Sequence, residues 1–254
     1  MTSDSSKGPQ GRVTSQPRQH DVSIDALADD LFGLNWRAIK TLGVAFAHPG
    51  RYSEAAWSSS WQDQFTPSFR LWFTLVAVLF FFQFFWADAD GALIAMYTAQ
   101  MESSAVSLPD GVSARDASQY FARVNFTILP FASAFGLFIL GAVYRAWGTA
   151  VPLVVRIRYV FAVTVPSTAL SLPVFWMLGY VPHTHATYFL FFSWLFPIPV
   201  NALIAYCGTF SQLAGGSRIW RSIALALMLF VAMASSGLIS SVLAGVWITL
   251  MHGV

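Results

Sequence analysis

Charged side chains are scarce in this sequence. Of its 254 residues, 10% are Asp, Glu, Lys or Arg, whereas 56% are hydrophobic. An ordinary soluble domain carries about 25% charged residues, so this chain has too few to cover a surface that faces water. Its formal net charge is only +2, and no basic cluster is present. The composition therefore excludes an ordinary water-soluble globule, and we expect no nucleic-acid partner.

Cysteine is almost absent as well, since Cys207 is the only one. A single cysteine allows no disulfide within the chain and no metal cluster built from cysteines. The first 20 residues are rich in Ser, Pro, Gln and Gly and contain no apolar run. We therefore expect no cleavable signal peptide there, and interpret residues 1–20 as a disordered cytoplasmic tail.

Long apolar runs, by contrast, are abundant after residue 66. Five of them approach or exceed the roughly 20 residues that an α-helix needs to cross the hydrocarbon core of a bilayer. Tyr and Trp gather near their ends, as in interfacial aromatic belts. The sequence therefore predicts an all-α, polytopic membrane domain over residues 67–254, with about five transmembrane helices. The predicted spans are Leu71–Trp86, Phe126–Trp147, Tyr159–Tyr180, Tyr188–Phe210 and Ile223–Leu250.

An amphipathic helical segment and a connector are expected over residues 21–66. From Asp21 to Ala47 the apolar residues recur at steps of three and four, which is the period of an amphipathic helix with one apolar face. Pro49 and Gly50 end this helix. Two placements remain open: the segment packs on the membrane domain, or it lies in the lipid interface, where Trp36 and Lys40 would suit the headgroup zone.

The charges between the spans predict the orientation. Residues 145–158 carry a net charge of +3 and residues 211–221 carry +2, whereas residues 87–125 carry −3. Short loops rich in Lys and Arg stay in the cytoplasm. We therefore expect a bacterial cytoplasmic (inner) membrane protein with its N-terminus inside and its C-terminus outside. Residues 91–101 are too short to cross and are expected to form a helix on the outer surface.

No charged residue lies in the central part of a predicted span, and the strongly polar residues inside the spans are Gln83 and Asn201. Gln83 and Asn201 could line a cavity, but polar residues in membranes often bond neighbouring helices, and we favour that role. The spans also contain prolines, which break helical hydrogen bonds and in transporters often mark substrate sites. These candidate cavity-lining prolines are Pro166, Pro173, Pro197 and Pro199.

The last span carries small residues at four-residue spacing, which lets another helix approach closely. The partner helix could belong to this chain or to another copy. We expect this helix-packing stripe to consist of Gly237, Ser241 and Gly245 beside Ser236, Ser240 and Ala244.

No catalytic, cofactor or metal site is predicted. His183 and His185 lie in one short loop, but two histidines supply at most half of a tetrahedral zinc site. His48 precedes Pro49 and is interpreted as a helix-ending residue. No phosphate-binding loop, dinucleotide fingerprint, nucleophile elbow or HExxH motif is present.

Three short motifs resemble an uncharacterised family of bacterial multi-pass membrane proteins. The motifs are His-Pro-Gly-Arg at His48–Arg51 before Pro67, Pro-Phe-Ala from Pro130, and Arg-Tyr-Val-Phe-Ala from Arg158. The likeness covers roughly residues 35–250. The chain lacks the basic element that the family carries after the first motif and the zinc ribbon that many members carry at the N-terminus. The five-span layout is also similar to Yip-type membrane proteins. Both resemblances imply a fold and a location, not an activity.

The leading functional hypothesis from the sequence is a non-enzymatic scaffold or assembly factor. Such a protein would act through helix–helix or lipid contacts, with membrane lipids, other membrane proteins or another copy of itself as partners. The alternative is a small transporter or permease that uses the proline-broken spans.

Overall fold

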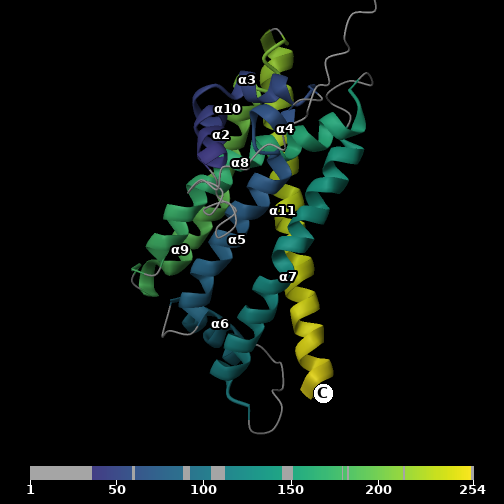
Figure 1. The fold of residues 1–254 in the computed structure, drawn as a ribbon. Helices are drawn as coiled ribbons and strands as arrows, with labels where there is room; N and C mark the ends of the chain where they lie inside the picture. Colours follow the sequence, from purple (N-terminus) through teal and green to yellow (C-terminus); the bar gives the residue numbers. More distant parts are fainter. Residues whose placement is uncertain are drawn as a thin grey trace, which may run out of the picture. The chain divides into compact units, whose positions relative to one another are not determined.

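Helix is the only regular secondary structure that the computed structural model shows in the residues it describes (Figure 1). The described residues are 36–58, 61–87, 92–103, 112–144, 151–178, 180–181, 183–213 and 215–252. The helices are α2 (Trp36–Ala47), α3 (Pro49–Ala55), α4 (Trp61–Gln64), α5 (Ser68–Ala87), α6 (Ala92–Ser103), α7 (Ala114–Val143), α8 (Leu153–Leu178), α9 (His183–Leu195), α10 (Pro197–Cys207) and α11 (Gly215–His252).

Four stretches of helix are long and apolar enough to cross a membrane. They are Ala114–Val143, Leu153–Met177, Thr187–Cys207 and Gly215–Leu250, so the all-α membrane class is confirmed with four candidate spans. The predicted first span falls in α5, whose described apolar stretch, Ser68–Phe82, is shorter. The third stretch consists of α9 and α10, which a turn at Phe196 separates just before Pro197.

The α7 helix begins well before the predicted start of its span at Phe126. Ser113 caps its N-terminus, since the Ser113 side chain accepts a hydrogen bond of 3.1 Å from the Asp116 backbone N–H. The helix has 30 residues and is therefore about 45 Å long, more than the roughly 30 Å of a bilayer's hydrocarbon core. α11, with 38 residues, is longer still.

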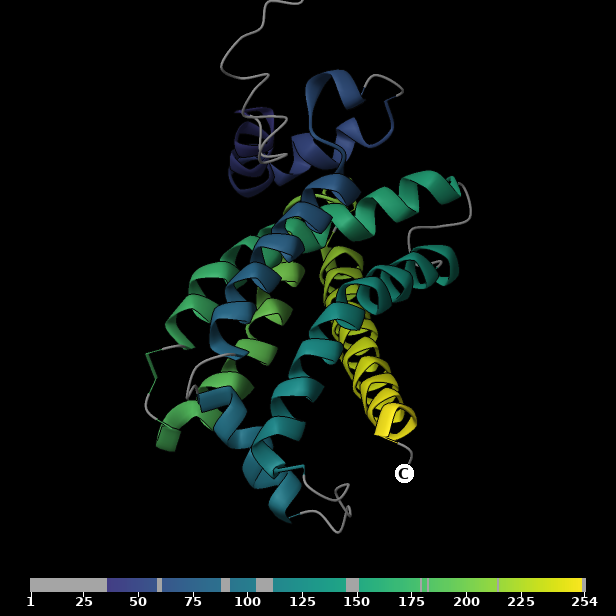
Figure 2. The same ribbon diagram turned by 60° about the horizontal axis from the view of Figure 1, so that its bottom comes forward.

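The α7 and α11 helices pack side by side in opposite directions (Figures 1 and 2). Near the start of α7, the Tyr120 hydroxyl accepts a 3.1 Å hydrogen bond from the Trp247 indole near the end of α11. Further along α7, the Ala132 carbonyl accepts a 3.0 Å hydrogen bond from the Ser236 hydroxyl. From the first pair to the second, the residue number increases along α7 and decreases along α11, so the two helices are antiparallel.

The α5 and α8 helices run in the same direction. The first turn of α5 meets the third turn of α8 where the rings of Phe69 and Phe161 lie 5.1 Å apart, edge to face. Their later turns meet where the rings of Phe82 and Trp176 lie 5.3 Å apart. Each edge-to-face pair adds about 0.5–1.5 kcal/mol to the area that the rings bury.

The short helices α2, α3 and α4 contact the N-terminal end of α8 and the C-terminal end of α10. The Arg158 guanidinium donates 2.8 Å to the Ala56 carbonyl, and the Trp57 indole N–H donates to the Tyr159 hydroxyl. α2 buries Ala38, Thr41 and Ala45 and leaves Trp36 exposed. The described part of the predicted amphipathic segment, α2, contacts α3 and α8. Residues 21–35 lie outside the described residues, and the placement of the segment stays a prediction.

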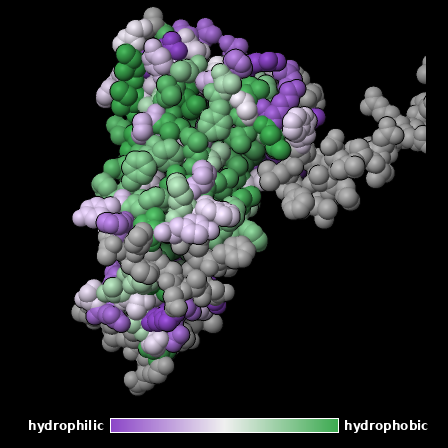
Figure 3. Space-filling view, turned by 90° about the vertical axis from the view of Figure 1, so that its left-hand side faces the viewer, coloured by the Kyte–Doolittle hydropathy of each residue, from purple (hydrophilic) through white to green (hydrophobic). Residues whose placement is uncertain are grey.

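Large apolar side chains remain exposed along the long helices. Figure 3 shows one face with a broad hydrophobic area, toward whose upper and lower ends hydrophilic residues gather. On α9 the exposed side chains include Phe191 and Phe192, and on α11 they include Leu238 and Val242. An apolar surface of this kind fits the hydrocarbon of a bilayer, where no polar covering is needed.

Candidate functional site

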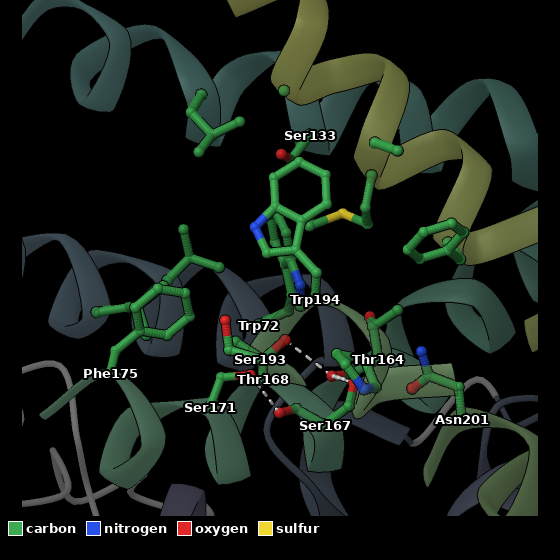
Figure 4. A pocket seen from close by; sticks show the side chains of 18 of the residues that line it. Trp72, Ser133, Thr164, Ser167, Thr168, Ser171, Phe175, Ser193, Trp194 and Asn201 are labelled. Atoms are coloured by element: carbon green, nitrogen blue, oxygen red, sulfur yellow. Dashed lines mark hydrogen bonds between the residues drawn. The ribbon is translucent and has the colours of Figure 1, made fainter. Parts of the chain in front are cut away.

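A cavity of about 210 Å³ lies among α5, α7, α8, α9, α10 and α11 (Figure 4). Its walls are largely apolar, but a row of hydroxyl groups, one amide and two indole rings interrupt them. The polar and aromatic lining residues are Trp72 and Phe80 from α5, Ser133 from α7, Thr164, Ser167, Thr168, Ser171 and Phe175 from α8, Ser193 and Trp194 from α9, Asn201 from α10 and Phe230 from α11.

The hydroxyl row follows one face of α8. Thr164, Ser167, Thr168 and Ser171 have spacings of three, one and three residues, which places all four on the same side of a helix. Each hydroxyl donates to a backbone carbonyl three or four residues earlier, at 2.8 to 3.2 Å, and Figure 4 draws three of these bonds. Because a hydroxyl has one hydrogen and two lone pairs, the row presents acceptors.

Two polar atoms of the lining are buried without a partner among the described residues. They are the Trp72 indole nitrogen, in a side chain that is 0% exposed, and the Asn201 amide oxygen, in one that is 5% exposed. A buried polar group that lacks its hydrogen bond costs about 1–3 kcal/mol. One of these atoms, the Trp72 indole nitrogen, is a donor, and the other, the Asn201 amide oxygen, is an acceptor.

Trp194 stands at the side of the cavity where α9 approaches α11. A Cβ atom placed on Gly237 would lie 3.6 Å from the Trp194 Cη2 atom, so the glycine leaves room for the ring. Three residues after Trp194, Pro197 starts α10. Pro197 has no N–H to donate to the Ser193 carbonyl, and the helix is interrupted beside the cavity.

The described lining contains hydroxyls, an amide, indoles and apolar groups, and none of them ionises near neutral pH. General acid–base or nucleophilic chemistry requires an activating group beside the nucleophile, and the hydroxyls here donate to backbone carbonyls instead. The arrangement is therefore suited to binding.

The candidate cavity residues from the sequence divide into three groups. Asn201 and Pro197 line the cavity. For Asn201 the sequence alone favours a hydrogen bond to a neighbouring helix over a place in a cavity wall. Pro166, Pro173 and Pro199 are not among the described lining residues. The Gln83 side chain lies outside the described residues.

The small-residue stripe of α11 has two sides with different surroundings. Ser236, Ser240 and Ala244 are buried, and Ser240 donates 2.6 Å to the Asn125 side-chain oxygen of α7. Gly237 faces Trp194, whereas a Cβ on Gly245 would meet nothing within 4 Å. Ser241 is only partly buried.

The close approach of α7 to this stripe also involves Gly136 of α7, which sequence reasoning missed. A Cβ atom there would lie 2.7 Å from the Ser236 Oγ atom and 3.4 Å from the Ala232 carbonyl oxygen. The signal that could have found it is the pair Ala132 and Gly136, which are small residues at four-residue spacing. The hydroxyl row of α8 was missed as well, although its spacing is visible in the sequence.

The histidines lie apart from this cavity. His183 starts α9, but its side chain is outside the described residues, and His185 is exposed. Across the part of the chain that the structure describes, no three His, Cys, Asp or Glu side chains come together as metal ligands would. His48 precedes α3, as a helix-ending residue of α2 would.

Three arginines cap the ends of helices. Arg156 donates 3.1 Å to the Ala142 carbonyl in the last turn of α7, and Arg218 donates 2.8 Å to the Tyr206 carbonyl in the last turn of α10. Arg158 bonds the Ala56 carbonyl after α3. Positive groups at helix C-termini are favourable because the last carbonyls lack helical partners and carry partial negative charge.

No protein-family model, curated protein or solved structure matches this chain. The resemblance of its short motifs to an uncharacterised membrane-protein family therefore stays a prediction, and the function has to be argued from the cavity.

Proposed function

We propose that this chain is a small transporter or permease that binds a small solute in the cavity near the middle of its helices. The cavity carries the proposal. It lies beside an interrupted helix, and its α8 wall, from Thr164 to Ser171, falls near the centre of the candidate span Leu153–Met177. Transporters commonly bind their substrates near the bilayer midplane, at broken helices.

The proposal includes five crossings of a bacterial cytoplasmic membrane. Arg158, in the basic loop expected to stay inside, bonds the Ala56 carbonyl of the segment before α5. The start of α7 lies at the other end of the helices, because α7 is antiparallel to α11 and α11 starts beside Tyr144 at the end of α7. This arrangement supports a crossing through α5, whose 20 residues are about 30 Å long.

The scaffold hypothesis has weaker support than the cavity. The exposed apolar side chains of α9 and α11 fit lipid as well as a protein partner, so they do not favour a scaffold. A cavity with unpartnered polar atoms is different, because hydrocarbon cannot satisfy them.

Cysteine accessibility tests the proposal without knowledge of the ligand. In a Cys207→Ser background, Ser167→Cys would place a thiol in the cavity, and Leu238→Cys would place one on an exposed apolar position of α11. A charged, membrane-impermeant thiol reagent is applied to inside-out and right-side-out vesicles. We expect the Ser167→Cys thiol to react from both sides, at different rates, because a transporter opens its site alternately.

The Leu238→Cys thiol should stay unreactive, since a thiolate does not form in hydrocarbon. Reaction of the cavity thiol from one side only would contradict transport while leaving a binding cavity. Absence of reaction from either side would overturn the proposal.

A further inference from the structure

The cavity also defines the kind of molecule that it can hold, and this step rests on the cavity part of the proposed function, not on transport. We infer that the ligand is an electrically neutral molecule about the size of a substituted benzene ring, with a hydroxyl group that both donates and accepts hydrogen bonds.

Size sets the first limit. The cavity measures about 210 Å³. An engineered protein cavity of about 150 Å³ holds benzene, and one water molecule takes about 30 Å³ of liquid volume. The space beyond a benzene site is therefore enough for roughly two further heavy atoms. Trp194 in the wall is 52% exposed, so the cavity is open there and this limit applies to the part of a guest that lies inside it.

Hydrogen bonding sets the second limit. The Trp72 N–H needs an acceptor, and the Asn201 amide oxygen needs a donor. The hydroxyl row adds acceptors, since Ser167, Thr168 and Ser171 already donate to the backbone. A hydroxyl can meet either need, because it accepts through its lone pairs and donates its hydrogen. A ring without a donor would leave the Asn201 oxygen unsatisfied.

Charge sets the third limit. None of the described lining residues is charged, and transferring an unpaired ion into such surroundings is costly. A neutral guest avoids that cost. The rings of Trp72, Phe175, Trp194 and Phe230 in the wall are suited to an aromatic body, which prefers edge-to-face or offset contacts with other rings.

Two probes separate the hydrogen bond from the ring. Phenol is neutral at pH 7 and carries one hydroxyl, whereas anisole has the same ring with the hydroxyl methylated. Binding is measured by titration calorimetry on the full chain in lipid nanodiscs, with empty nanodiscs to subtract partition into lipid. We expect phenol to bind about fivefold more tightly than anisole, as one net hydrogen bond provides.

Two threonines form a matched pair for the next step. Thr168 lines the cavity and Thr127 is exposed on α7, and both hydroxyls donate to the carbonyl four residues earlier, at 2.8 and 2.9 Å. Thr168→Val and Asn201→Leu should each reduce the preference for phenol over anisole by several-fold. Thr127→Val should leave the preference unchanged, because it removes the same local bond outside the cavity.

Equal binding of phenol and anisole, or tighter binding of phenyltrimethylammonium than of phenol, would overturn the ligand class. Lack of saturable phenol binding in folded protein would overturn it as well. These results are independent of the thiol experiment. If phenol binds selectively but the cavity thiol reacts from one side only, the ligand class holds and transport is refuted. If the thiol reacts from both sides but phenol and anisole bind equally, transport holds and the ligand class is refuted.

Discussion

Two glycines of α11 occupy equivalent positions in the sequence pattern but have different neighbours. A Cβ on Gly237 would meet the Trp194 ring at 3.6 Å, whereas a Cβ on Gly245 would meet nothing within 4 Å. A leucine extends further than a Cβ, so Gly237→Leu crowds the Trp194 ring at the edge of the cavity. The sequence alone predicts that leucine harms both positions, and the structure restricts the effect to Gly237.

We expect Gly237→Leu to destabilise the protein by about 1–3 kcal/mol through overpacking. Its midpoint of thermal unfolding should fall by several degrees. Gly245→Leu is the matched control and should leave the midpoint unchanged. Both are measured in detergent by tryptophan fluorescence. An equal fall in both variants would show that the α11 stripe meets another copy of the chain.

Tyr52 is a buried tyrosine in α3, one of the short helices α2–α4 that form the end layer of the protein. Its ring packs edge to face on Trp61 and Phe65, at 5.4 and 5.6 Å between ring centroids. Its hydroxyl is buried without a partner among the described residues. Burial raises the pKa of Tyr52 above its ordinary value of 10.0, because the anion cannot be hydrated there. The folded protein therefore keeps this proton at pH values where the unfolded chain has lost it.

Stability should consequently be insensitive to Tyr52 below pH 10 and should fall above it, since the unfolded state then binds fewer protons. The slope from this one group approaches about 1.4 kcal/mol per pH unit. Tyr52→Phe should remove the contribution of Tyr52 to the pH dependence of the free energy of unfolding. The contributions of Tyr97 and Tyr144, whose pKa values burial also raises, should remain. Unfolding in denaturant from pH 8 to 11 measures both slopes, and identical slopes would contradict the buried hydroxyl.

At the scale of elements, the joint between α3 and α10 depends on Gly208. A Cβ atom there would lie 2.8 Å from the carbonyl oxygens of Ile204 and Pro49 and from the Ser53 hydroxyl. Backbone atoms cannot yield as a flexible side chain can. Even alanine must therefore separate α3 from the end of α10.

We expect Gly208→Ala to lower the free energy of unfolding by about 1–3 kcal/mol, as overpacking does. Gly43→Ala in α2 is the control, because nothing lies within 4 Å of its Cβ position and alanine favours a helix over glycine by about 1 kcal/mol. The two changes should therefore have opposite signs in denaturant unfolding. Stabilisation by both would mean that α3 is not held against α10.

Sequence reasoning recovered the membrane helices better than their ends or their faces. The apolar run of the second span starts at Phe126, but the helix continues back to Ala114 because Ser113 caps a polar extension that no hydropathy window favours. The break near Pro197 was foreseeable, since proline removes a hydrogen bond wherever it stands. The side of α11 that meets α7 could not be foreseen. Residue spacing shows which side chains share one face of a helix, but not which face turns toward another helix.

The cavity could be foreseen only in fragments. Asn201 and Pro197 were singled out, and the hydroxyl spacing on α8 was visible in the sequence. Trp72, from α5, joins them only once the helices are assembled, and its missing hydrogen-bond partner depends on that assembly. Such contacts join residues far apart in the chain, which local periodicity does not encode.

At the scale of the molecule, one end gathers the basic residues. Arg156, Arg158 and Arg218 bond carbonyls at helix ends there, close to α2, α3 and α4. The opposite end carries α6 and the start of α7, where Arg115 and Arg123 accompany the acidic Glu102 and Asp116; the net charge of −3 belongs to the whole of residues 87–125. Since basic loops stay in the cytoplasm, the first end should be inside and the second outside.

Topology is therefore the prediction that tests the whole molecule. Reporter fusions after Ala105, Ala150, Thr184, Gly215 and Val254 should read outside, inside, outside, inside and outside. A tag at Met1 decides whether α5 crosses. With five crossings Met1 and Ala105 lie on opposite sides, whereas with four they lie on the same side. A shared side would also require α2–α4 to leave Arg158 and Gly208, because those contacts fix the layer to the basic end. A cytoplasmic signal at Val254, or an external one at Ala150, would refute the orientation.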